Sequence, residues 1–262
     1  MTNSSTMAAF FAITLSASMY LLASSVFADS STEKSNDDPV ESIQVTELRY
    51  IEREPGIDDF ELVVQVGERF MRIDDMTDDS GYIVFDDEKK TIFSVSHFDR
   101  SVLVIEPFDF SKSDSPANYE TEYLELSDAP AVSDNNVFNY REYTGKGKEE
   151  ETCIEVQLVE NLMPEVRRML KNYLNVVSGQ QVKMTDNKIT DIQTACYFVS
   201  QIYNTGSYYD KGLPIQEWQS NGRFKALTSF KKVSSDKARF NVPESYRRFT
   251  IDKDSKMALP KR

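Results

Sequence analysis

The side chains that most often carry nucleophilic or metal chemistry are scarce in this sequence. It has one histidine, His97, and two cysteines, Cys153 and Cys196, neither of which is near the histidine in the sequence. This pattern does not indicate a Cys-His catalytic dyad, and it lacks the ligands of a structural zinc site. We therefore predict no catalytic residue, no cofactor and no metal site. We expect a protein that is not an enzyme, with a hydrolase of unrecognised type as the further alternative.

Aspartate pairs recur along the first half of the chain, at Asp74-Asp75, Asp78-Asp79 and Asp86-Asp87. Their carboxylates could gather around calcium, but the spacing does not match the Asp-x-Asp-x-Asp-Gly loop that binds this ion. Charged hairpin turns are the simpler interpretation, since charge also protects an exposed sheet edge. Among the 43 acidic residues, no two are singled out as the acid and base of a glycoside hydrolase.

The net charge of the chain argues against nucleic acid as a partner. The formal charge is −13, and phosphate backbones are recognised mainly through an excess of lysine and arginine. Hydrophobic residues make up 40% of the chain, which is enough for one sizeable core. We therefore expect one globular domain that does not bind nucleic acid, and the sequence does not indicate its oligomeric state.

The N-terminal apolar run has the pattern of a secretory signal peptide. Small or branched residues close the run, and the acidic Asp29 follows Ala28, so we predict cleavage between these two residues. An uncleaved membrane anchor is the alternative, because the run is long and no lysine or arginine precedes it. No cysteine follows the run to carry a lipid, so we expect a soluble protein that is periplasmic or secreted. The predicted segments are a signal peptide (1–28), a flexible acidic leader (29–42), a single domain (43–251) and a polar tail (252–262).

Export has a consequence for the two cysteines. An exported chain meets an oxidising compartment, and Cys153 and Cys196 are its only thiols, so we predict that they form a disulfide. In the chain-entropy model, closing a loop of this length stabilises the fold by about 4 kcal/mol. Two buried free thiols are the alternative.

Alternating apolar and polar residues predict an antiparallel sheet as the main element of the domain. Residues 59–105 have the pattern of a meander of about five strands, because short polar turns separate the apolar runs. A first strand at 43–52 should pair with the start of this meander. Gly67-Glu68 has the sequence of a two-residue type II′ turn, in which glycine supplies a positive φ. Further strands are expected at 119–126, 137–144 and 153–159.

Apolar stripes with helical spacing predict two helices late in the chain. The first, residues 164–177, has proline in its first turn and Gly179 beyond its end. The second begins at Asp186 and ends before Gly206, with Cys196 on its buried face. We expect the pair to lie across one face of the sheet in an α+β fold.

Motifs near the C-terminus, taken in their order, carry a resemblance to a known superfamily. They are Gly212-Leu213-Pro214, a hairpin glycine at Gly222, and Phe240-x-x-Pro243-x-x-Tyr246. Upstream, Tyr82-Ile83-Val84-Phe85-Asp86 is similar to a strand of related bacterial domains of unknown function. Together they resemble the LolA/LolB-like periplasmic lipoprotein carriers over most of residues 43–250. The chain departs from the carriers in placing its predicted helices late instead of ahead of the first strand.

The resemblance implies a curved antiparallel sheet, an incomplete barrel, with helices packed across it and an apolar cavity. We therefore expect a soluble LolA-like protein that binds a hydrophobic ligand, either a lipid or the acyl chain of a lipoprotein, between sheet and helices. The alternative is a cell-envelope protein-protein interaction module with a filled core and no ligand. The residues expected to line the cavity are Leu62, Val64, Phe85, Leu170, Tyr173, Leu174 and Val199.

Overall fold

The computed structural model describes residues 41–76, 80–185 and 193–251. The predicted signal peptide, its cleavage site at Ala28 and Asp29, nearly all of the acidic leader and the polar tail lie outside the described residues. Within the described part, no helix is both long enough and apolar enough to cross a membrane.

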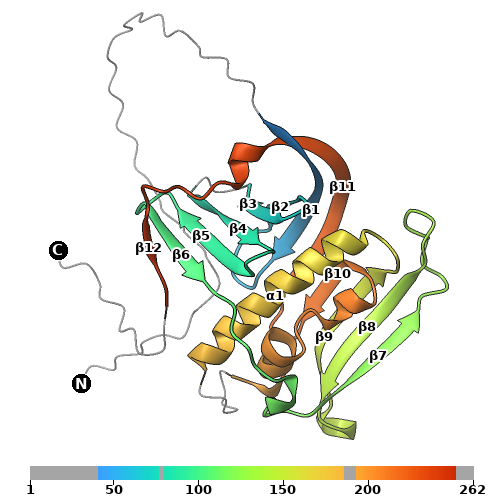
Figure 1. Ribbon diagram of the computed structural model, residues 1–262. Helices are drawn as coiled ribbons and strands as arrows, with labels where there is room; N and C mark the ends of the chain where they lie inside the picture. Colours follow the sequence, from blue (N-terminus) through green and yellow to red (C-terminus); the bar gives the residue numbers. More distant parts are fainter. Residues whose placement is uncertain (1–40, 77–79, 186–192, 252–262) are drawn as a thin grey trace, which may run out of the picture. The chain divides into compact units, whose positions relative to one another are not determined.

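The strands of the described chain form one twelve-stranded sheet (Figure 1). Their bounds are β1 (Ser42–Arg53), β2 (Phe60–Val66), β3 (Phe70–Asp75), β4 (Gly81–Asp86), β5 (Thr91–Ser96), β6 (Ser101–Ile105), β7 (Tyr119–Glu125), β8 (Val137–Thr144), β9 (Glu151–Val159), β10 (Leu213–Gln219), β11 (Phe224–Asp236) and β12 (Arg247–Phe249). Their order in the sheet is β12-β6-β5-β4-β3-β2-β1-β11-β10-β9-β8-β7. The sheet is open, with β12 and β7 at its edges.

The predicted five-strand meander is confirmed as β2 to β6. Each of these strands pairs with its neighbour in sequence, because short turns bring antiparallel neighbours together. β1 pairs with β2 as expected, and on its other side it pairs with β11. The β1–β11 pair thus joins the first described strand to one late in the chain, and the two curve together in Figure 1.

Two details of the strand prediction are wrong. Gly67 is not among the described glycines with a positive φ, so the type II′ turn does not form. Residues 67–69 connect β2 to β3 instead, and the Gly67 N–H donates to the Phe70 carbonyl oxygen at 2.9 Å. This longer connection needs no positive φ at the glycine. The sheet is also not wholly antiparallel, because the chain returns after β11 and β12 pairs in parallel with β6.

Helix α1 spans Pro164–Met184 and is longer than predicted, so Gly179 lies inside it. A Cβ at position 179 would lie 2.7 Å from the Phe108 carbonyl oxygen. The backbone at Phe108 can therefore approach the helix closely only because glycine has no side chain. Glycine is therefore needed at position 179 for close packing and does not mark the end of the helix.

The described part of the second predicted helix is short and wound differently. Its expected start, residues 186–192, lies outside the described residues. The segment that follows is a π-helical turn, η3 (Tyr197–Tyr203), and after it comes a 3₁₀ segment, η4 (Ser207–Asp210). Such π segments are rare, and they occur often at functional sites. The fold is therefore α+β and mostly sheet.

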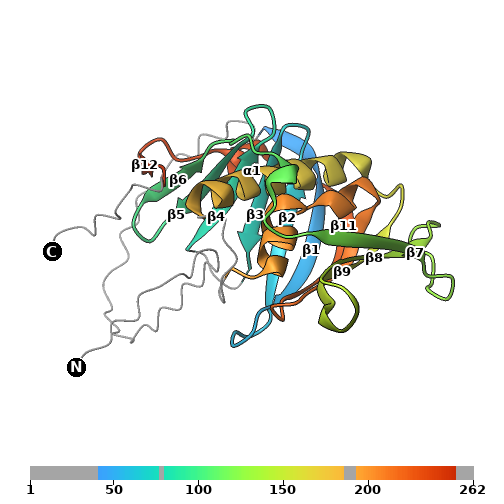
Figure 2. The ribbon, with the colours of Figure 1, turned by 90° about the horizontal axis from the view of Figure 1, so that it is seen from below.

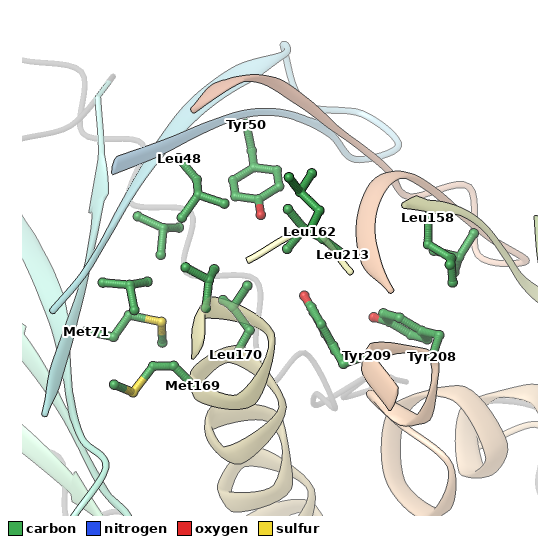
Figure 3. Close-up of a cluster of buried hydrophobic side chains, with 14 of the residues drawn as sticks. Leu48, Tyr50, Met71, Leu158, Leu162, Met169, Leu170, Tyr208, Tyr209 and Leu213 are labelled. Atoms are coloured by element: carbon green, nitrogen blue, oxygen red, sulfur yellow. The ribbon is translucent and has the colours of Figure 1, made fainter. Parts of the chain in front are cut away.

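The main core lies between α1 and one face of the sheet, and Figure 2 shows the helix lying across the strands. Met169 and Leu170 of α1 pack in the same cluster as Leu48 of β1 and Met71 of β3, and all four are at most 6% exposed. Figure 3 shows these side chains directed into one layer. Full burial of a side chain of this size contributes about 1.5–3 kcal/mol, so this layer holds α1 on the sheet.

Candidate functional site

A cavity of about 160 Å³ lies between α1, η3 and η4 on the helical side and strands of the sheet on the other. Its apolar and aromatic lining consists of Leu62, Val64, Ile73, Ile154, Leu170, Tyr173, Leu174, Tyr208, Tyr209 and Phe224. The remaining lining residues are Glu52, Ser200, Gln201, Thr205, Glu217, Gln219, Arg223 and Lys225. The lining is thus mixed, with apolar and aromatic side chains beside nearly as many polar and charged ones. Small-molecule sites ordinarily combine an apolar wall with convergent polar groups.

The structure brings most of the residues proposed for the cavity together. Leu62, Val64, Leu170, Tyr173 and Leu174 line it.

The other two residues proposed for the cavity lie elsewhere in the core. Phe85 is fully buried, and its ring meets the ring of Tyr173 edge-on, with 5.9 Å between their centroids. Val199 is also fully buried and packs with Cys153 and Cys196. Phe85 thus packs against the lining residue Tyr173 without lining the cavity itself. Val199 belongs to a separate cluster around the disulfide.

The predicted disulfide is confirmed. Cys153 of β9 is bonded to Cys196, which immediately precedes η3. The bond therefore attaches the π-helical turn to the sheet. Since η3 and the residues after it supply one side of the cavity, the disulfide also limits how far that side can move.

Sequence reasoning missed the charged part of the cavity. The register places Lys225 of β11 directly opposite Glu52 of β1 on one side and Glu217 of β10 on the other. Residues directly opposite each other in antiparallel strands project from the same face of the sheet. Glu217 is only 7% exposed, whereas the adjacent Trp218 is 37% exposed. The sequence carries no signal for this arrangement, because a glutamate beside a tryptophan is ordinarily the exposed one of the two.

Lys225 is the central charge of this row. Its Nζ lies 2.9 Å from Glu52 Oε1 and 4.4 Å from the centroid of the Tyr50 ring. Burial alone would lower the pKa of Lys225, but the carboxylates of Glu52 and Glu217 outweigh it and raise that pKa. The lysine therefore stays a cation and is held by Glu52 and by the face of an aromatic ring.

Glu217 is placed differently. Tyr208 Oη donates a hydrogen bond to Glu217 Oε2 at 3.1 Å. Burial raises the pKa of Glu217, and the opposing effects of Lys225 and Tyr208 do not cancel it. Within the described residues Glu217 forms no ion pair, although Lys225 lies opposite it in the register and lowers its pKa against the effect of burial. It is a buried carboxyl beside the cavity.

Two further tyrosines place hydroxyls at the cavity. Tyr173 and Tyr209 make no side-chain hydrogen bond within the described residues. Burial raises the pKa of Tyr173 to about 12 and that of Tyr209 well above its ordinary value, so both remain neutral phenols. Figure 3 shows Tyr50 and Tyr209 directed toward the same space. These phenols can donate or accept hydrogen bonds with a molecule in the cavity.

A second buried carboxyl, Glu142 of β8, lies outside the cavity lining and is 0% exposed. Its Oε1 accepts hydrogen bonds from Tyr140 Oη at 2.8 Å, Asn204 Nδ2 at 2.7 Å and Ser207 Oγ at 3.2 Å. Its Oε2 is buried and has no partner in the described structure. Burial raises the pKa of Glu142 to about 7, against the effect of these donors.

The single histidine takes part in a local contact at the far end of the meander. His97 Nδ1 lies 2.8 Å from Tyr246 Oη, and the two rings meet edge-on. No group of three or more metal-ligating side chains is found in the described ranges. His97 is therefore a link between the turn after β5 and the chain that leads into β12.

Comparison with known proteins adds little to this geometry. No family model and no curated protein sequence matches the chain. Among solved structures, an uncharacterized conserved protein from Thermus thermophilus is similar over 80% of this chain and 91% of its own, with 8% identity and a TM-score of 0.38. The structure of PNGF-II in a C2 space group is similar over 80% of this chain, with 12% identity and a TM-score of 0.38. The match spans 31% of the PNGF-II chain, and similarity at this level carries no conclusion about activity.

Proposed function

We propose that this protein is an exported, LolA-like binding protein that holds a small hydrophobic molecule in the cavity between α1 and the sheet. The observation that carries the proposal is the apolar part of the lining, formed by Leu62, Val64, Leu170 and Leu174, which shares the cavity with tyrosines whose hydroxyls make no hydrogen bond in the described structure. The apolar lining would hold a ring or a short chain. The hydroxyls would orient a polar group.

The size of the cavity narrows the ligand class. Its volume of about 160 Å³ is close to the roughly 150 Å³ of an apolar protein cavity that binds benzene. It is smaller than the roughly 300–1,000 Å³ of pockets that enclose drug-sized ligands. A whole lipoprotein acyl chain is therefore too large to be enclosed. The proposed ligand is an aromatic ring, a short aliphatic chain, or the end of a longer chain.

The proposed cellular location rests on two observations. The sequence begins with a signal-like apolar run, and the described chain contains a disulfide. Disulfides persist mainly in oxidising compartments such as the periplasm and the extracellular space. Both observations support export.

Toluene and benzyl alcohol test the binding proposal directly. We expect both to bind saturably in NMR titrations, with the largest chemical-shift changes at Leu170, Tyr173 and Leu174. Leu174→Phe should fill the cavity and abolish binding, whereas the matched change Leu124→Phe, at a position 63% exposed on β7, should leave binding intact. Absence of saturable binding, with no lipid retained through purification, would refute the proposal.

The interaction-module alternative has one specific observation in its favour. Strand β7 forms an edge of the sheet and is largely exposed, including Leu124. An added strand from a partner could pair with this edge. The exposed glutamates Glu120, Glu122 and Glu125 on the same strand disfavour uncontrolled pairing. We therefore keep it as the second candidate, which failure of ligand binding would bring forward.

A further inference from the structure

One carboxyl of the cavity lining takes part in no ion pair. Lys225 pairs with Glu52 at 2.9 Å, and Arg223 lies 2.7 Å from Glu54 and 3.7 Å from Glu52. Both cations thus contact carboxylates of β1 and the turn after it. In the described structure Glu217 has no ion-pair partner, although it lies in the same cross-strand row as Glu52 and Lys225.

The position of Glu217 makes this lack of an ion pair relevant to a ligand. The residue is 7% exposed and lines the cavity. Tyr208 donates to Oε2, while Oε1 makes no hydrogen bond within the described residues. This oxygen is not among the fully buried side-chain atoms that lack a partner, so a small polar group can reach it. A ligand in the cavity is placed to supply a donor.

Aromatic rings lie around Glu217 and Lys225. The ammonium of Lys225 already lies 4.4 Å from the centre of the Tyr50 ring, which shows that an ammonium is accommodated at this end of the cavity. The rings of Tyr208 and Tyr209 are adjacent, with centroids 4.9 Å apart. Aromatic faces beside a carboxylate are a common arrangement for recognising amines.

We propose that the cavity selects a small molecule with a protonated amine, whose ammonium group pairs with Glu217 while its apolar part lies against Leu170 and Leu174. This inference rests on the binding function proposed above and names the ligand class. An ammonium gives Glu217 a charge-assisted hydrogen bond, which is about twice as strong as a neutral one. A carboxylate ligand would instead bring a further negative charge next to Glu217 and Glu52.

The proposal makes binding depend on pH. The groups that face Glu217 are Tyr50 and Glu52 from β1, Arg223 immediately before β11, Lys225 within it, and Tyr208 and Tyr209 from η4. Burial raises the pKa of Glu217, so its carboxyl takes up a proton at a higher pH than an exposed glutamate does, and the protonated form cannot pair with an ammonium. Affinity for an amine should therefore increase with pH until the ligand amine itself loses its proton.

Three probes that share one ring test the selectivity. Benzylamine and benzyl alcohol are near-isosteric and differ in the charge of the head group, and benzoate carries a carboxylate on the same ring. We expect calorimetric titration of the full chain at pH 7.5 to give at least tenfold tighter binding of benzylamine than of benzyl alcohol, and no binding of benzoate. In Glu217→Gln the amine should lose its advantage and bind within twofold of the alcohol. The exposed control Glu106→Gln should keep the wild-type preference.

The outcomes separate this inference from the proposed function. If benzyl alcohol binds but benzylamine is no tighter in the wild type, or if Glu217→Gln keeps the preference, the amine inference is overturned and the binding function stands. If no probe binds, both are overturned. Should Glu217→Gln fail to fold, the wild-type preference decides: tighter binding of benzylamine than of benzyl alcohol supports the pairing, and equal affinity refutes it.

Discussion

The carboxyl of Glu142 should make the protein less stable as the pH rises from acidic to neutral. Glu142 is fully buried, and burial raises its pKa from the ordinary 4.5 to about 7. The folded state therefore keeps a proton that the unfolded state loses between these two values. By linkage, stability is highest below pH 4.5 as far as this group is concerned, and it is lost as the pH rises to 7.

The size of the effect follows from the two pKa values. One pKa unit corresponds to about 1.4 kcal/mol, so the shift is worth about 3 kcal/mol at and above pH 7. Glu142→Gln removes the titration while keeping an oxygen that can accept from Tyr140, Asn204 and Ser207. The amide nitrogen would then take the place of Oε2, which has no partner in the described structure.

Urea unfolding at a series of pH values measures this contribution. The difference in free energy of unfolding between Glu142→Gln and the wild type should shift in favour of the variant by about 3 kcal/mol from pH 4.5 to 7.5 and then remain constant. The exposed Glu106→Gln should show no such change relative to the wild type. Parallel curves for Glu142→Gln and the wild type would refute the reasoning, because the carboxyl would then titrate alike in the folded and unfolded states.

Three further predictions concern packing, the disulfide and export. Gly179→Ala should destabilise the fold by more than about 1 kcal/mol in urea unfolding, because the alanine Cβ would lie 2.7 Å from the Phe108 carbonyl oxygen. Alanine favours helices, so a gain in stability would contradict the close approach of Phe108 to the helix. Replacing Cys153 and Cys196 by serine should lower the free energy of unfolding by about 4 kcal/mol, since the disulfide joins residues that are 43 positions apart in the sequence. Thiol labelling of the denatured, unreduced wild-type protein should find no reactive thiol. Intact mass of the exported protein should show a chain that begins at Asp29, and a species that retains residues 7–27 would exclude cleavage there.

Much of the sheet was predictable because its information is local. In β2 to β6, period-2 alternation and short polar turns mark each strand, and sequence neighbours pair with each other. The start of α1 was equally readable, since Pro164 occupies its first turn. The end of α1 could not be read from the sequence. Gly179 resembles a helix-terminating glycine, but it lies inside α1 and is required by the close approach of Phe108, which is far away in the sequence.

The candidate site was predictable only in its apolar half. Leu170, Tyr173 and Leu174 belong to a helical stripe whose spacing indicates burial. Glu217 gives no such signal, because its burial depends on η4 lying over β10 and on the register of β10 with β11. An isolated glutamate has the same local sequence pattern whether or not another element covers it.

The sequence by itself therefore determined the meander, the start of the first helix, the pairing of Cys153 with Cys196 and most of the apolar side of the cavity. These features follow from the spacing of residues along one segment or from the number of cysteines. Only the tertiary structure decided that Lys225 pairs with Glu52 and that Glu217 and Glu142 are buried carboxyls. The physical reason is that the pKa and the partners of a charge depend on desolvation and on neighbours brought together by long-range strand pairing, neither of which is encoded within a single stretch of chain.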